Sequence, residues 1–190
     1  MPADNDRVIS TLPEGLWSAP EPSVPAGLDE DPVLRIRVPA SLHYTYNPGT
    51  APSRFLRGLA EKKIIGEACP VSGDVYVPPR GLSPLCGLPT TEQVEVGPNG
   101  TVTSFCVVHI GFGVNAPPTP FVTALILPDG AAISLYGPIQ EMPYDEVRIG
   151  MRVEPVWVDD DQLTASFENI KWWRAIDEPD VAAELLRGHM

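Results

Sequence analysis

The chain has 190 residues, 43% of them hydrophobic and 20% charged, which suffices for one folded domain or two small ones. Its formal net charge of −12 argues against nucleic-acid binding, which draws most of its non-specific affinity from Lys and Arg, and against anionic membrane surfaces. The 23 prolines favour strands, turns and extended segments over long helices, and no apolar run of about 18 residues predicts a membrane span.

Residues 1–32 are rich in proline and acidic side chains and contain few residues that a core would bury. We therefore predict an extended or disordered arm; the alternative is an arm that orders along a partner subunit, with Trp17 among its few anchors. The first residues lack the basic start and apolar core of a signal peptide. Because three cysteines are also too few for a disulfide scaffold, we expect a cytoplasmic protein with reduced thiols.

Residues 33–47 are predicted to be extended and residues 52–63 to form a short helix, as their apolar patterns indicate. On the helix, Phe55 and Leu59 fall on one face. Four basic side chains crowd into the same segment, which is unusual in so acidic a chain: Arg54, Arg57, Lys62 and Lys63. These side chains form either a solvated face or a site for an anionic ligand or an acidic partner.

The stretch CPVSGDVYVPPRGLSPLCG, residues 69–87, has the outline of a zinc ribbon, in which two Cys-x2-Cys knuckles flank a hairpin. Here the four corners are Cys69, Ser72, Ser83 and Cys86. Structural zinc needs thiolate or imidazole ligands, and a serine hydroxyl is neither. We therefore predict a ribbon without metal and expect no cofactor, with zinc disfavoured but left open. Serine hydrogen bonds and packing of residues 75–77 would hold the hairpin, with the two sulfurs facing each other.

From residue 92 onward, short runs of alternating apolar and polar residues predict β-strands separated by turns. Runs around PNG, around PDG and around Asp159–Asp161 predict three hairpins. Five or six such strands suit a closed barrel of the OB type, which has no exposed edge. The acidic turn also suggests calcium, but three acids at a hairpin tip are usually only a solvated turn. A last short helix is predicted over residues 178–187.

The Gly- and Pro-rich loop 110–121 interrupts the strands and carries Phe112 and Val114. Apolar side chains on such a loop indicate a binding surface or, alternatively, a cap on the barrel end. Cys106 and His109 are three residues apart on a predicted strand, so they point to opposite faces and make a poor nucleophile–base pair. We expect Cys106 to be a core cysteine, and the sequence contains neither a G-x-S-x-G motif nor a phosphate-binding loop.

The predicted fold class is mainly β, with an N-terminal helix and a rubredoxin-like ribbon hairpin followed by a five- or six-stranded OB-fold barrel. The predicted parts are an extended or disordered acidic arm over 1–32, an extended segment with the helix and a degenerate zinc ribbon over 33–90, an OB-fold domain over 91–176, and a C-terminal helix and tail over 177–190.

Several motifs occur together in this chain: a helix ending in RFLRGLAEKKIIGEAC, the stretches CPVSGDVYVPPRG and SPLCG, the strand TVTSFCVVH, and IGMRVEPVWV at residues 149–158. In combination they resemble the zinc-ribbon plus OB-fold family known as domain of unknown function thirty-five, over about residues 50–175. The residues in register with the family pattern are Tyr76, Pro78, Pro79, Arg80, Gly87, Ser104 and Gly150. Ser72 and Ser83 depart from it, and this departure concerns the metal rather than the fold.

The resemblance implies a small non-catalytic subunit that associates in a hetero-oligomer with a thiolase-like or lipid-transfer-protein-type enzyme. It implies that the partner acts on acyl-CoA substrates, by thiolysis, condensation or retro-aldol cleavage, in lipid or steroid side-chain degradation, with acyl-CoA at the interface. Stable interfaces tend to use large apolar anchors. The side chains expected at the contact are Trp17, Phe55, Leu59, Phe112 and Val114.

Two other functions stay open at this point. A stand-alone acyl-CoA or small-ligand binder would set Arg54, Arg57, Lys62 and Lys63 against the CoA phosphates. Single-stranded nucleic-acid binding would stack bases on aromatic side chains such as Phe105, Tyr136 and Trp157, but the net charge makes it the weakest of the three hypotheses.

Overall fold

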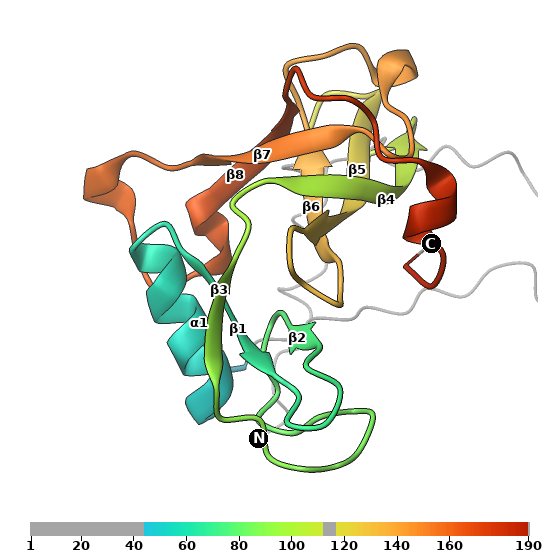
Figure 1. Ribbon diagram of the computed structural model, residues 1–190. Helices are drawn as coiled ribbons and strands as arrows, with labels where there is room; N and C mark the ends of the chain where they lie inside the picture. Colours follow the sequence, from blue (N-terminus) through green and yellow to red (C-terminus); the bar gives the residue numbers. More distant parts are fainter. Residues whose placement is uncertain (1–43, 112–116, 190) are drawn as a thin grey trace, which may run out of the picture. The chain divides into compact units, whose positions relative to one another are not determined.

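The computed structural model describes residues 44–111 and 117–189, which Figure 1 draws in colour. The chain divides into two units, residues 1–45 and residues 46–190, and the elements below belong to the second. No helix of the described residues has the length and apolarity that crossing a membrane requires. The predictions that lie outside the described residues are those on the arm 1–32, on Trp17, on Phe112 and on Val114, together with most of the predicted extended segment 33–47.

The first half of this unit is a helix packed on a small antiparallel sheet (Figure 1). Its elements are α1 (Thr50–Ala60), β1 (Ile64–Ala68), β2 (Val75–Tyr76) and β3 (Gln93–Val96), with the strand order β2-β1-β3. The helix therefore spans 50–60 instead of the predicted 52–63. It ends before Lys62, whose φ of 58° is left-handed and cannot continue the helix.

The predicted hairpin around PNG is wrong, because β3 does not pair with the strand that follows it. Instead β3 pairs antiparallel with β1, with Val96 opposite Ile64. The chain then turns through Gly97, whose φ is 76°, and enters the barrel at Gly100. The alternation in QVEV correctly indicates a strand, but a local pattern does not say which strand is its partner.

The second half is a closed five-stranded barrel. Its strands are β4 (Gly100–Val108), β5 (Phe121–Pro128), β6 (Leu135–Ile139), β7 (Arg152–Trp157) and β8 (Ile170–Ala175), in the order β4-β5-β6-β8-β7. Antiparallel pairing of β4 with β7 closes the barrel, and β6 lies parallel to β8. The mainly β fold class is confirmed, and so are the predicted β5–β6 and β7–β8 pairs.

Short 3-10 helices occupy the connections and the C-terminal segment. They are η1 (Tyr144–Glu146), η2 (Asp160–Gln162), η3 (Phe167–Asn169) and η4 (Ala183–Leu186). The acidic turn thus forms η2. The helix predicted over 178–187 is reduced to the turn η4, because the backbone N–H of Val181 donates to the carbonyl of Gly150 (2.8 Å) and holds this segment on the barrel.

The core is continuous from α1 through the small sheet into the barrel. Its fully buried side chains include Phe55, Leu59, Ile64, Val77, Val102, Ile126, Val153 and Trp173. Alternation governs which side chains enter it: Val122, Ala124 and Ile126 point inward, while Leu125 is exposed. The Trp172–Trp173 pair behaves as predicted, with Trp173 buried and Trp172 only half-buried.

The expectation that Cys106 is a core cysteine is wrong, because Cys106 is exposed. A register shift in β4, between Val102 and Ser104, is the reason. Val102 points inward before this bulge, and after it Phe105 and Val107 pack against the core instead of the even-numbered residues. One extra residue has therefore turned Cys106 to the outer face.

Candidate functional site in the ribbon knuckles

Two tight turns form the knuckles of the ribbon. The first, residues 69–73, precedes β2, and the second, residues 83–87, follows it. In the first, the N–H of Gly73 donates to the carbonyl of Cys69 (2.9 Å), and the N–H of Ser72 donates to the Cys69 sulfur (3.4 Å). In the second, the N–H of Gly87 donates to the carbonyl of Ser83 (2.9 Å). Both glycines have left-handed φ values, 78° and 68°, which is the conformation a knuckle turn requires. The ribbon shape is therefore present.

At the centre of the knuckles, the two sulfurs face each other as predicted. The Sγ atoms of Cys69 and Cys86 are 3.8 Å apart, and the Ser83 hydroxyl donates to the Cys69 sulfur (3.1 Å). Cys69 and Ser83 are buried, whereas Cys86 is exposed. The Ser83 oxygen also accepts from the N–H groups of Leu85 (3.3 Å) and Cys86 (3.4 Å), so the predicted turn hydrogen bonds are confirmed.

The remaining corner, Ser72, is engaged elsewhere. Its hydroxyl donates to Asp74 Oδ2 (2.7 Å) and accepts from the N–H of Asp74 (3.3 Å). Ser72 nevertheless lies beside Cys69: the nearby side chain of Ser72, then its backbone N–H, which donates to the sulfur, and then Ser83 lower the pKa of the Cys69 thiol from 9.0 to about 6, against the opposing effect of burial. The sulfur is thus stabilised as a thiolate by neutral donors.

These donors do not fit a structural zinc ion. Two thiols and two serine hydroxyls cannot complete a tetrahedral site of thiolate and imidazole ligands. Among residues 44–111 and 117–189, no group of three or more His, Cys, Asp or Glu side chains is placed to hold a metal. His109 packs edge-on against Tyr144 in the barrel half, with ring centroids 6.0 Å apart. The metal-free ribbon stays a prediction, and no chemistry of this chain is derived through zinc.

The hairpin between the knuckles packs as predicted, with Val75, Tyr76 and Val77 buried. Gly66 on β1 makes room for it, because a Cβ there would lie 2.5 Å from the Cγ1 atom of Val75. The backbone N–H of Ala132, in the β5–β6 connection, donates to the carbonyl of Val75 (2.8 Å). The hairpin is therefore anchored on the small sheet and on the barrel.

A buried carboxylate behind the knuckles was not identified from the sequence. Glu67 on β1 is 1% exposed, and it accepts hydrogen bonds from Arg54 Nη1 (3.2 Å) and from the hydroxyl of Thr90 (2.8 Å). It thereby joins α1 to the segment that leaves the second knuckle. A lone Glu in the run IIGEA gives no sign of this, because both partners are distant in the sequence.

The basic side chains of the helix region do not converge on one site. Arg54 pairs with Glu67, Lys62 with Asp160 in η2, and Lys63 with Glu61. Arg57 is exposed. Because three of the four positive charges are paired with carboxylates of the same chain, they are poorly placed to bind the phosphates of CoA.

The proposed partner-contact residues on α1 need correction. Phe55 and Leu59 are 0% exposed, and the Phe55 ring packs against Phe167 with centroids 5.0 Å apart. The helix face that looked like an interface in the sequence is used by the chain's own core. Several other elements also carry exposed apolar side chains, and those on the knuckles are Val71, Leu82, Leu85 and Leu88.

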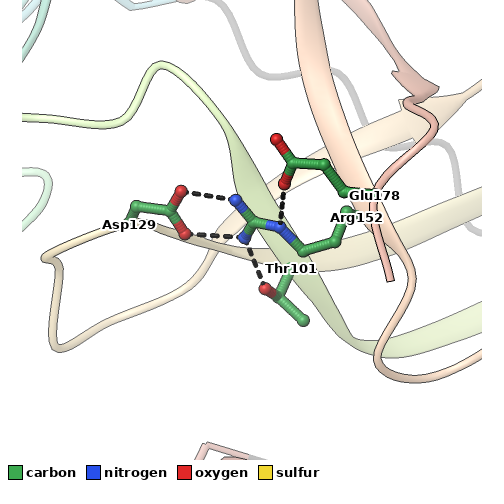
Figure 2. Close-up of polar contacts among 4 residues, drawn as sticks. All are labelled: Thr101, Asp129, Arg152 and Glu178. Atoms are coloured by element: carbon green, nitrogen blue, oxygen red, sulfur yellow. Dashed lines mark hydrogen bonds and ion pairs between the residues drawn. The ribbon is translucent and has the colours of Figure 1, made fainter. Parts of the chain in front are cut away.

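A second polar cluster fastens the C-terminal segment to the barrel. Arg152 on β7 donates to both carboxylate oxygens of Asp129 in the β5–β6 turn, to the Thr101 hydroxyl (2.8 Å) and to Glu178 (2.9 Å), as Figure 2 shows. These partners, Asp129 first, raise the pKa of the guanidinium further above its ordinary value. Arg148 adds a two-pronged pair with Asp180. The cluster is structural, since both arginines are paired with carboxylates of the same chain.

A small apolar cavity lies where α1 meets the barrel. Its volume is about 80 Å³. The lining side chains include Phe55, Leu135, Tyr136, Phe167, Ile170 and Trp173. Sites for drug-sized ligands are usually several times larger, roughly 300–1,000 Å³. The cavity is therefore too small to take an acyl chain with its CoA group.

Comparisons with known proteins place this geometry in context. Residues 93–158 match the family model of the C-terminal OB-fold domain of ChsH2. Two solved structures have a similar fold: a protein of unknown function from the DUF35 family of Sulfolobus solfataricus (23% identity, TM-score 0.51, covering 67% of this chain and 84% of that one) and the Ltp2-ChsH2(DUF35) aldolase (22% identity, TM-score 0.51, covering 67% and 95%). No curated protein matches the chain. The predicted OB-fold is confirmed.

Proposed function

We propose, from the match of residues 93–158 to the model of the ChsH2 C-terminal OB-fold domain, that this chain is a non-catalytic accessory subunit of a thiolase-like enzyme. The observation that carries the proposal is the likeness to the Ltp2-ChsH2(DUF35) aldolase, in which 95% of the compared chain is covered. In that assembly a DUF35 protein is named together with a second component. The likeness covers 67% of this chain, and the accessory role is carried over from that assembly as a proposal.

The arrangement of the reactive side chains among the described residues favours a non-catalytic role for this chain. The thiolate-forming sulfur, Cys69, is buried and faces another cysteine instead of a base. Cys106 is exposed on β4, and His109 packs edge-on against a tyrosine. None of these side chains is arranged as a nucleophile with a general base beside it. In the proposal, the partner carries the catalytic groups.

The knuckles are the part of the described surface best suited to contact the partner. Val71, Leu82, Leu85 and Leu88 leave apolar side chains in solvent on neighbouring turns of one ribbon. Turns fixed by backbone hydrogen bonds present such side chains without a large entropic cost on binding. The proposed occupant is the thiolase-like subunit, and a hetero-oligomer follows. The finer proposal is that the complex acts on acyl-CoA substrates of lipid or steroid side-chain degradation.

Co-expression tests the proposal directly. The full chain is tagged and produced together with a thiolase-like protein encoded beside it, and the complex is isolated by affinity and size-exclusion chromatography. We expect the two proteins to co-elute in a fixed ratio and to act on an acyl-CoA substrate only as a complex. A chain that stays monodisperse and alone in the presence of the candidate partners would contradict the proposal.

Variants of the knuckles locate the interface. Leu85→Asp places a charge on an exposed side chain of the second knuckle, and Leu185→Asp makes the same change on the exposed side chain of η4. If the knuckles contact the partner, the first variant lowers the yield of complex by roughly tenfold or more, while the matched control co-elutes normally. Equal yields of complex from both variants would show that the interface does not lie on the knuckles.

A stand-alone acyl-CoA binder is the less well supported alternative. The pairing of Arg54, Lys62 and Lys63 with carboxylates of the same chain counts against it, and the described cavity at α1 is too small to be its ligand site. Calorimetry of the isolated chain with several acyl-CoAs distinguishes the two proposals. Binding in the micromolar range without a partner would favour the alternative, and no heat up to millimolar ligand would remove it.

A further inference from the structure

The ribbon brings two thiols together in a setting that suits sulfur chemistry better than metal binding. The sulfurs of Cys69 and Cys86 are 3.8 Å apart although the residues are 17 positions apart in the chain. We propose that Cys69 and Cys86 are a redox-active dithiol, which a small-molecule disulfide such as oxidised glutathione converts to an intramolecular disulfide that closes the ribbon. This inference goes beyond the accessory role and does not depend on it.

The geometry requires only a local closure. A disulfide has an S–S bond of about 2.05 Å, so the sulfurs must approach each other by somewhat less than 2 Å. Cys86 belongs to a run of exposed residues, 84–89, in the second knuckle, whereas Cys69 is itself buried and its backbone is bonded on both sides, to the carbonyl of Asp74 (2.8 Å) and from the N–H of Gly73 (2.9 Å). The exposed residue, Cys86, is therefore the one that moves toward the buried sulfur. Its turn is a short loop ended by Gly87 rather than part of a long strand.

The two cysteines divide the roles in the reaction. Cys86 is exposed and accessible to an oxidant, whereas Cys69 is buried beside the Ser83 hydroxyl and the Ser72 N–H. Hydrogen bonds from these donors favour the thiolate of Cys69, the form that attacks a disulfide. Cys86 therefore meets the external disulfide first, and Cys69 resolves the mixed disulfide.

The reaction balances in two exchange steps. The Cys86 sulfur loses its proton and attacks one sulfur of the small disulfide; the disulfide bond of the small molecule breaks, a mixed disulfide between Cys86 and one half forms, and the other half leaves as a thiolate that solvent protonates. The Cys69 thiolate then attacks the Cys86 sulfur, the Cys69–Cys86 bond forms, and the second half leaves and is protonated by solvent. The protein loses two electrons, and the small disulfide gains them as it becomes two thiols.

Cys106 provides an internal control. It is exposed on the outer face of β4, in the barrel half of the unit, and does not belong to the knuckles. A thiol there reacts with oxidised glutathione but has no resolving cysteine within the ribbon. Its conversion to serine removes this side reaction and leaves the proposed pair as the two remaining cysteines.

The test uses the full chain with Cys106→Ser in buffers of defined oxidised-to-reduced glutathione ratio, with a metal chelator present. Free thiols are blocked with an alkylating reagent and counted by intact mass, and peptide mapping identifies linked cysteines. We expect both thiols to disappear together, with loss of two hydrogens and a peptide that joins residue 69 to residue 86. The oxidised protein melts roughly 5–10 °C higher than the reduced one, because the cross-link restricts the unfolded chain.

A second experiment removes the resolving thiol, Cys69. In Cys69→Ser with Cys106→Ser, the first step proceeds and the second does not, so the chain retains one glutathione on Cys86. Stable glutathione adducts on Cys86 while Cys69 is present would overturn the proposal. Two alkylatable thiols that persist at the most oxidising ratio, or disulfides found only between chains, would overturn it as well.

Discussion

The sulfur of Cys69 makes the stability of the protein depend on pH. Hydrogen bonds from Ser72 and Ser83 lower its pKa from 9.0 to about 6 in the folded state. A thiol with a depressed folded pKa stabilises the folded state once it is ionised. This stabilisation is complete above the unfolded pKa and is lost as the pH falls through about 6. Unfolding free energies should therefore rise between pH 6 and 9 more in Cys106→Ser than in Cys69→Ser/Cys106→Ser.

Ultraviolet thiolate absorbance gives the same comparison without unfolding the protein. The difference between these two variants reports Cys69 alone, and we expect it to titrate near pH 6. Ser72→Ala removes the side chain that lowers this pKa most and keeps the backbone N–H on the sulfur, so it should move the titration upward. A midpoint that is unaffected by Ser72→Ala would show that the serine does not act on the sulfur.

Gly150 illustrates how a single backbone position fixes the C-terminal segment. Its φ is 91°, and a Cβ built on it would lie 2.4 Å from the carbonyl oxygen of Val181. We expect Gly150→Ala to cost about 3 kcal/mol or more, because left-handed strain is joined by a clash with backbone that cannot rotate away. Gly130→Ala is the matched control: its φ is 86°, but the nearest atom is 3.8 Å away, so about 1 kcal/mol is expected. Urea unfolding measures both, and equal losses would contradict the steric explanation.

At the scale of single residues, hydrogen bonds between neighbours in the sequence could be predicted, and those between distant residues could not. The hydrogen bonds of Ser72 and Ser83 lie within three residues of their donors and acceptors in the knuckle turns, so their spacing predicts them. Glu67 receives its hydrogen bonds from residues 13 and 23 positions away. No spacing rule connects such residues until the fold brings them together.

Arg152 joins three elements, because its guanidinium reaches the β4 strand, the β5–β6 turn and the C-terminal segment (Figure 2). Its side chain is only 11% exposed, so its charge depends on these partners. We expect Arg152→Leu to lower the unfolding free energy by about 2 kcal/mol, since the Thr101 hydroxyl and the Asp129 carboxylate lose their donor. Thermal and urea unfolding measure the loss.

Arg174 on β8 offers a matched control for this arginine. It pairs with Glu154 and Glu141, but its side chain is 47% exposed. Exposed ion pairs contribute little, so Arg174→Leu should change stability by no more than about 0.5 kcal/mol. If both variants lost the same stability, burial would not be what makes the Arg152 cluster important.

Elements differ in how far the sequence predicts them. The β5–β6 and β7–β8 pairs follow from alternation and turn residues, because in both cases the strand partner is the next strand in the chain. The β3 strand does not follow this rule, because it pairs with the edge of the earlier strand β1 and not with the next strand in the chain. Cys106 fails for a related reason: the bulge in β4 reverses the alternation, and no residue type marks its position.

In the unit 46–190, the two halves share a core instead of meeting at a polar boundary. Phe55 of α1 packs on Phe167 of η3, and Lys62 pairs with Asp160 of η2. The backbone of the ribbon hairpin is hydrogen-bonded to the β5–β6 connection. The boundary proposed near residue 90 is therefore crossed by apolar and polar contacts, and cooperative unfolding of both halves is expected.

Phe55→Ala tests this cooperativity. Phe55 is 0% exposed, and removing its ring should cost about 3–5 kcal/mol, because the cavity that remains lies against both α1 and the barrel. Far-UV circular dichroism and tryptophan fluorescence, to which the barrel residue Trp173 contributes, should then shift to lower urea by the same amount. Leu85→Ala, on an exposed knuckle position, should leave both transitions within about 0.5 kcal/mol of the unmodified chain. If Phe55→Ala split the two signals into separate transitions, the helix and ribbon would form a unit that folds independently of the barrel, and the shared core would not be what joins them.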